Sequence, residues 1–310
     1  MGVISLGLTE KGLKAGFEAA FRPKDEQALY REVAMRVASD RDEEHHRWLG
    51  SLPGMEEWGP GLRLHGLSAD SYNVANMMYA VGMPIDRNEV SDDQTGQIMQ
   101  RVNQLGSRAA LHKDELLGDL FENGGAANFK SYDDAIFFSA AHETGESGAQ
   151  DNDLTFEVAD ADVNVFTAAE GKEALQTAIA AMRSFKDDRG RPFKTSATGL
   201  KLVCPVTQEF GWREVLETAL ISNTDNIMRG KVDVIGFAEL TTDGVWYLLK
   251  TDEAALRPFI FQDREAIQTE YLGQGTETWV REHKAVYKVW GRYRMAYGFW
   301  PYAVRTKFTT

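Results

Sequence analysis

Side chains that can bind metal gather near residue 45. His45 and His46 follow Asp42, Glu43 and Glu44, so imidazole and carboxylate groups lie next to one another in the chain. Consecutive helical residues point about 100° apart, however, and no CxxC or HExxH spacing accompanies them. We therefore interpret this run as a solvated polar segment and predict no metal site.

Two pairs of adjacent aspartates could in principle supply the acid and the base of glycoside hydrolysis. They are Asp133–Asp134 and Asp187–Asp188, and Trp246 or Trp290 could offer an aromatic platform for a sugar ring. Sequence neighbours rarely form the facing pair that this reaction requires, so turn chemistry explains both pairs better. A carbohydrate-active enzyme stays open as an alternative, and it would need two carboxylates that face each other in a cleft.

Motifs for nucleophilic catalysis and for nucleotide binding are missing from the sequence. The other histidines are scattered, and there is no GxSxG sequence. The glycine clusters lack the strand–GxGxxG–helix context, and there is no GxxxxGK[ST] loop. Cys204 is the single cysteine and has apolar neighbours, which predicts a buried, inert thiol with no internal disulfide. We expect no enzyme, no cofactor and no catalytic residue.

Bulk composition narrows the class of protein. A chain of 310 residues that is 43% apolar can form one large domain or two modest ones. Its 34 basic and 47 acidic residues give a net charge of −13, so a protein that grips nucleic-acid phosphates is not expected. The sequence contains neither a signal peptide nor a run of ~20 apolar residues, which predicts synthesis and folding in the cytoplasm.

The longest pattern of strand-forming residues lies between Arg257 and Trp300. From Tyr287 to Phe299, apolar and cationic side chains alternate, which predicts a strand with two unlike faces. A strand from His283 to Trp300 would extend about 55 Å at ~3.3 Å per residue, whereas strands usually have ~5–6 residues. We expect the Tyr287–Phe299 side to pack on a helix. The side chains left for salt bridges, solvent or DNA are Lys288, Arg292 and Arg294.

A long helix is predicted upstream of these strands, over residues 91–123. Ser91 and Gln94 can form a capping box at its start, and Asn123 followed by two glycines can end it. Apolar side chains recur between them at helical spacing. An unbroken helix of this length would extend about 45 Å, which together with the long strand suggests a long, flat domain.

The first 90 residues predict elements that cannot bury themselves. The spacing from Asp25 to about Ser39 predicts one short amphipathic helix, and polar and Gly/Pro-rich sequence follows it. Two strand-like pieces over residues 62–88 predict a long hairpin with one apolar face. Such segments should lie against another surface. The side chains expected to contact that surface are Trp48, Trp58, Met77, Met78, Tyr79, Val81 and Met83.

The order of these features resembles the Hong Kong 97 (HK97-like) capsid fold of tailed phages. The quoted pieces are WLGSLP and EEW, SYNVAN, IDRNEVSDDQTG, LGSRAALHKDELLGDLFENG, YDDAIFFSAAH, RPFIFQ and YKVWGRYRMAYGFW. Together they are similar to the family of Mu-like major head subunits across nearly the whole chain. The resemblance implies an α+β fold with an N-terminal arm at 1–60, an extended loop at 61–90, a peripheral domain at 91–130 and 256–310, and an axial α/β domain at 131–255.

The same resemblance implies a function, which is to build an icosahedral phage shell. Copies of the chain would form hexamers and pentamers that enclose double-stranded DNA, with the apolar arm and loop buried between subunits. The arm-like sequence begins within about 25 residues of Met1, so we expect a separate scaffold chain, together with a portal. A decoration protein is a further partner that the sequence leaves open. We expect no covalent cross-links and no membrane partner. The alternative of the same fold is an encapsulin-like nanocompartment shell.

Overall fold

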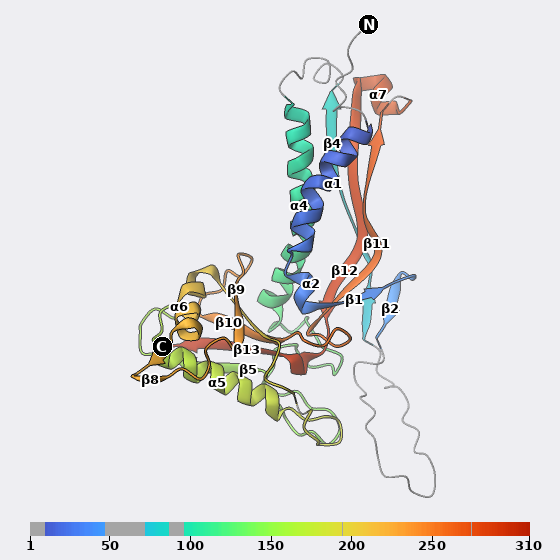
Figure 1. Ribbon diagram of the computed structural model, residues 1–310. Coiled ribbons are helices and arrows are strands. Elements are labelled where there is room, and N and C mark those ends of the chain that lie inside the picture. The colour runs from blue at the N-terminus through green and yellow to red at the C-terminus, as the bar shows by residue number, and fades with distance from the viewer. Residues whose placement is uncertain (1–9, 47–71, 87–95, 194, 274) are drawn as a thin grey trace, which may run out of the picture.

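The chain folds into two lobes, one elongated and one compact, in a computed structural model that describes residues 10–46, 72–86, 96–193, 195–273 and 275–310 (Figure 1). The elongated lobe contains two helices that run beside long strands. The compact lobe contains a second sheet with its own helices. Among the described helices, none is both long and apolar enough to cross a membrane.

The sheet of the elongated lobe has four strands, and two of them are unusually long. Strands β11 (Phe259–Leu272) and β12 (Lys284–Tyr297) form an antiparallel pair, with helix α7 (Glu277–Glu282) between them in sequence. Strand β1 (Ala34–Ala38) pairs parallel with β11, and β4 (Met77–Asp86) pairs antiparallel with β12. The resulting order is β1-β11-β12-β4.

Two helices cover one face of this sheet. Helix α4 (Gln97–Asn123) and helix α1 (Glu10–Glu26) pack side by side along it (Figure 1). Gly106 of α4 lies so near the backbone of Phe17 that a β-carbon would come within 2.6 Å of its carbonyl oxygen, so a larger residue would separate the helices. The apolar side chains buried between helices and sheet are Leu13, Phe17, Ile85, Ile98, Val102, Tyr287 and Val289.

The predicted alternation along the last long strand is confirmed. In β12, Tyr287, Val289 and Tyr293 are buried, while the cationic residues between them are partly exposed. Phe299 departs from the prediction, because it follows the end of β12 and packs in a separate cluster with Ile260. The strand alternation therefore ends before Phe299.

The compact lobe is a five-stranded mixed sheet of order β5-β13-β10-β6-β9. Its strands are β5 (Asp153–Glu157), β6 (Leu200–Cys204), β9 (Val232–Gly236), β10 (Val245–Lys250) and β13 (Ala303–Thr309). Helices α5 (Ala168–Ser184) and α6 (Val206–Glu217) pack on it, and two short strands, β7 (Leu220–Ile221) and β8 (Thr224–Asp225), follow α6. The central strand β10 is buried along its whole length.

The single cysteine belongs to the core of this second lobe. Cys204 is fully buried at the end of β6, as its apolar neighbours predict. Burial raises the pKa of its thiol to about 12, so the reactive thiolate is scarce at neutral pH. The prediction of a buried, unreactive thiol fits this environment.

Two expectations about the elements are wrong. The helix expected over Asp25–Ser39 is instead the end of α1, a four-residue helix α2 (Tyr30–Val33) and strand β1. Residues 34–38 become a strand because β11 offers them a ladder of backbone hydrogen bonds, and such tertiary pairing overrides local helix propensity. Strand β13 lies in the compact lobe rather than with the long strands, so the boundary expected at 256–310 does not hold.

Of the long hairpin expected over 61–90, the first strand-like piece lies outside the described residues. Strand β4 pairs with β12, while a separate short ladder joins β2 (Glu43–His45) to β3 (Asn73–Ala75). Ser91 and Gln94, the expected capping residues, lie outside the described residues, and Gly96 occupies the N-cap position of α4.

Candidate assembly surface

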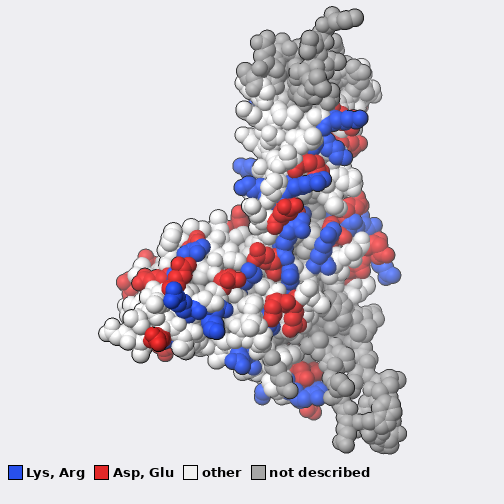
Figure 2. Space-filling view, viewed as in Figure 1, with Lys and Arg blue, Asp and Glu red and all other residues white. Residues whose placement is uncertain are grey.

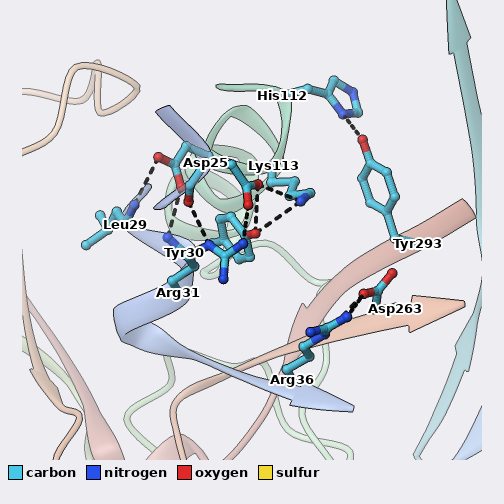
Figure 3. Close-up of polar contacts among 10 residues, drawn as sticks. Asp25, Leu29, Tyr30, Arg31, Arg36, His112, Lys113, Asp263 and Tyr293 are labelled. Atoms are coloured by element: carbon cyan, nitrogen blue, oxygen red, sulfur yellow. Dashed lines mark hydrogen bonds and ion pairs between the residues drawn. The ribbon is translucent and has the colours of Figure 1, made fainter. Parts of the chain in front are cut away.

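A buried ionic cluster attaches the N-terminal helices to α4 (Figure 3). Lys113 of α4 donates from Nζ to Asp25 Oδ1 at 2.7 Å and to the Tyr30 hydroxyl at 3.0 Å. The Tyr30 hydroxyl in turn donates to Asp25 Oδ1 at 2.9 Å, and Arg31 binds the other oxygen of that carboxylate. Burial alone would raise the pKa of Asp25, but the hydrogen bonds from Arg31 and Lys113 outweigh it and lower the pKa.

The next residue of α4 holds the start of α2. Asp114 accepts the backbone N–H groups of Leu29 at 3.0 Å and of Tyr30 at 2.9 Å, which satisfies amides that the short helix leaves open (Figure 3). Burial raises the pKa of this carboxyl above its ordinary value. Two consecutive residues of α4 therefore fix the connection between α1 and α2, although these residues are more than 80 positions apart in the sequence.

A second polar anchor holds the base of the β2–β3 ladder. The buried Gln262 side chain on β11 donates from Nε2 to the Val74 carbonyl at 3.0 Å and to Asn76 Oδ1 at 2.9 Å. Its Oε1 accepts from His46 Nε2 at 3.1 Å. His46 is thus a buried anchor, which corrects its interpretation as a solvated residue, whereas His45 is exposed. Within the described residues, no group of three His, Cys, Asp or Glu residues could hold a metal ion.

The apolar residues expected at partner contacts are brought together on β4. The exposed fractions are 47% for Met77, 59% for Met78 and 46% for Val81. Tyr79 and Met83 are half-buried, and the Tyr79 ring packs on those of Tyr293 and His112 at 5.0 and 4.6 Å between centroids. Trp48 and Trp58, the other two expected contact residues, lie outside the described residues.

A cleft of about 310 Å³ lies between β4, β12 and α4, next to these exposed side chains. Its walls are mostly apolar, and polar groups come from α4. The residues that matter for its chemistry are Tyr79, Val81, Leu105, Ala109, His112 and Val289. His112 and the Tyr293 hydroxyl lie 2.8 Å apart (Figure 3), and burial lowers the pKa of His112. Arg108 and Glu115 of α4 bring one charge of each sign to the cleft, and the rest of its lining suits an apolar side chain.

Three of the four cationic side chains of β12, those expected to face solvent, salt bridges or DNA, have partners within the same chain. Arg292 pairs with Asp42 at 3.0 Å, and Lys288 lies 3.9 Å from Glu270. Arg294 contacts the sulfur of Met77. On the face seen in Figure 2, blue and red side chains lie next to each other over the middle of the elongated lobe. These contacts favour salt bridges over phosphate binding for Lys288 and Arg292.

The aspartate pairs do not form a catalytic site. Asp187 accepts the backbone N–H groups of Arg189 and Arg191 within one turn, as turn chemistry predicts. Asp133 binds the buried His142, whose ring stacks on Trp300 at 4.0 Å, so this aspartate holds a loop in place. Sequence reasoning missed this His142 anchor, because nothing in the local spacing marks it.

The compact lobe has exposed apolar side chains that the sequence analysis also missed. Phe210 on α6 is 77% exposed, and other large apolar residues near the two ends of this helix are Val206, Leu220 and Ile227. Phe210 follows Val206 by four residues, which places the two apolar side chains on one face of a helix. This spacing is the one signal in the sequence that could have indicated the exposed apolar surface. The molecule therefore presents uncovered apolar surface on both lobes.

The negative charge is distributed unevenly between the lobes. Residues 131–255 contain 22 Asp and Glu against 11 Lys and Arg, so this part carries most of the net charge of −13. The rest of the chain is close to electrically balanced. The elongated lobe can therefore approach another copy with less charge repulsion than the compact lobe can.

Comparison with known families gives a match along almost the whole chain. The family model of the Mu-like prophage major head subunit gpT matches residues 6–166, 167–240 and 237–309. The chain is 31% identical over 139 residues to the Mu-like prophage FluMu major head subunit of Haemophilus influenzae, in an alignment that covers 44% of each protein. It is 29% identical over 119 residues to the major capsid protein of Escherichia phage Mu, covering 38% of each. Each alignment thus spans less than half of the curated relative.

Among solved structures, the chain is similar to the procapsid protein of bacteriophage JBD30. The TM-score is 0.55 at 19% identity, and the match covers 97% of this chain and 75% of that one. At this identity the likeness concerns the fold. The expected α+β, HK97-like capsid fold is confirmed.

Proposed function

Because the chain belongs to the family of Mu-like prophage major head subunits, we propose that it builds the shell of a phage head. Copies would form hexamers and pentamers of an icosahedral shell that encloses double-stranded DNA. The shell would form in the cytoplasm of the host bacterium. A structural role also fits the relatives, which are named as head and capsid proteins.

One observation carries this proposal beyond family membership. Both lobes expose large apolar side chains, of which Met78 on β4 and Phe210 on α6 are 59% and 77% exposed. A monomer in water gains nothing from such surface, whereas a shell subunit buries it against its neighbours. The apolar cleft and the aspartate turns hold no pair of facing carboxylates, which argues against the carbohydrate-active enzyme.

The two lobes would correspond to the two domains expected of a shell subunit. We assign the elongated lobe, with α4 and the β1-β11-β12-β4 sheet, to the peripheral domain and the compact lobe to the axial domain. Helix α1 and strand β1 pack into the elongated lobe, so we assign residues 10–46 to that lobe rather than to an arm of residues 1–60. The extended loop expected at 61–90 stays part of the proposal, as the segment that would contact a neighbouring subunit.

Other head components are part of the proposal. A separate scaffold chain and a portal would direct closure of the shell, and a decoration protein could bind its outside. Packaged DNA would lie near the protein without tight binding, because the chain presents more acidic than basic side chains and phosphate affinity grows with the number of cations. We expect no retarded band when the chain and double-stranded DNA are mixed at physiological salt.

Electron microscopy of the purified chain, alone and with a scaffold chain, tests the proposal. We expect closed shells, or rings of five and six subunits. A chain that stays monomeric in both samples, over a wide range of concentration and salt, contradicts the proposal. Nuclease-resistant DNA inside shells isolated from cells would identify a phage head, whereas protein cargo would identify a nanocompartment.

A further inference from the structure

Strand β4 ends the four-stranded sheet, and among the described residues no strand pairs with its outer edge. In an antiparallel ladder, alternate residues point their N–H and C=O groups toward the partner strand and away from it. Pro84 lies within β4 and pairs with Val286, and a proline has no N–H for a ladder. The even-numbered residues of β4, which alternate in step with Pro84, therefore point their backbone N–H and C=O groups away from β12.

The pairing of β4 with β12 has no register shift, so the same alternation of inward and outward backbone groups continues along the strand. The outward N–H groups belong to Met78, Ala80 and Gly82, and those of Tyr79 and Val81 point toward β12. The open edge is about 33 Å long for a ten-residue strand. It is a row of backbone donors and acceptors without strand partners.

Apart from Pro84 near one end of β4, this edge lacks the features that keep exposed strands apart. Edge strands of soluble proteins are usually short, bulged or charged, especially with lysine. Residues 77–85 contain no charged side chain, and Met77, Met78 and Val81 are about half exposed. A surface that stayed in water would be prone to aggregation, so its composition indicates that another chain covers it.

The cleft beside the edge supplies room for the side chains of that chain. A strand added to β4 would turn alternate side chains toward α4, into the space lined by Val81, Leu105 and Ala109. The cleft volume of about 310 Å³ has room for apolar side chains. Backbone pairing together with a pocket for alternate side chains is the arrangement by which an extended segment binds a sheet edge.

We propose that the outer edge of β4 receives an extended segment of a second copy of this chain as an added strand, with apolar side chains in the cleft beneath it. The second copy is the partner because an uncharged edge lets two chains of net charge −13 meet without like charges in contact. This inference rests on the proposed function, since a shell brings many copies together.

Amide hydrogen exchange at single-residue resolution, on the unassembled chain and on assembled shells, tests the inference. In the unassembled chain, the amides of Tyr79 and Val81 should be protected and those of Met78, Ala80 and Gly82 should exchange quickly. In shells the latter three should become protected by at least about tenfold. Shells in which these three amides still exchange quickly overturn the inference and leave the proposed function standing. A chain that never assembles overturns both.

A proline substitution distinguishes backbone hydrogen bonding at the β4 edge from a partner that only packs against this surface. Ala80→Pro removes one outward N–H and leaves the ladder to β12 intact, so the melting temperature of the unassembled chain should stay within a few degrees. The concentration needed for assembly should rise about tenfold, because one hydrogen bond at each contact is lost. Ala80→Ser keeps the N–H and should assemble as the parent does. Equal assembly of both variants would refute strand addition.

Discussion

Tyr247 and Tyr297 bind consecutive carbonyl groups at the end of α4, although they come from different sheets. The Tyr297 hydroxyl of β12 donates to the Leu120 carbonyl at 2.9 Å, and the Tyr247 hydroxyl of β10 donates to the Phe121 carbonyl at 3.0 Å. The last turn of a helix has carbonyls without intrahelical partners, and here each lobe satisfies one of them. The end of α4 therefore joins the two lobes.

We predict that Tyr297→Phe lowers the free energy of unfolding by about 1 kcal/mol, because it leaves the buried Leu120 carbonyl without its donor. Urea denaturation of the unassembled chain measures this change. Tyr271→Phe, at a half-buried position of β11, is the control and should change stability by less than about 0.5 kcal/mol. An equal effect of the two substitutions would show that the Tyr297 hydroxyl does not matter.

Lys113→Met should destabilise the chain by about 3 kcal/mol, since it leaves the buried Asp25 carboxylate without one of its cationic partners. Thermal or urea unfolding gives the value. The double variant Asp25→Asn/Lys113→Met should lose less than the sum of the two single changes, because the groups interact directly. Lys24→Met, on the exposed end of α1, serves as the control. Strict additivity would contradict a coupled pair.

The cluster also predicts a pH dependence. The folded-state pKa of Asp25 lies below the ordinary value of 3.8, so its contribution to stability is complete above that value and disappears as the pH falls through the folded-state pKa. The stability difference between the parent and Asp25→Asn should therefore be constant near neutral pH and shrink in acid. Asp114, whose pKa is also shifted, is present in both proteins, so its titration contributes to both stabilities and largely cancels in the difference. A difference that stays constant down to acid unfolding would be inconsistent with this assignment.

Gln262→Leu should cost about 2 kcal/mol, because the Val74 carbonyl and the Asn76 side chain lose their donor in a buried place. Amide exchange in β2 and β3 should accelerate more than exchange in β11 does, since the substitution frees the base of that ladder. Gln268→Leu lies further along the same strand, at an exposed position, and should leave both measurements nearly unchanged. Loss of protection throughout the sheet would instead indicate general unfolding.

Elements with a strong local pattern were predictable. The alternation in β12, the apolar stripe of α4 and the burial of Cys204 each depend on side chains that are neighbours in sequence. Helix and strand periods place such side chains on one face whatever the rest of the chain does. The order of these elements also carried the resemblance to the head subunit family.

The sequence by itself therefore determined the long helix, the long strands and the family. Only the tertiary structure decided that residues 34–38 form a strand, that β13 crosses to the compact lobe and that β4 is an open edge. It also brought Lys113 to Asp25 and Gln262 to His46. Each of these outcomes depends on contacts between segments far apart in the chain. The free energy of such contacts exceeds the small differences in local propensity, so local patterns alone could not predict them.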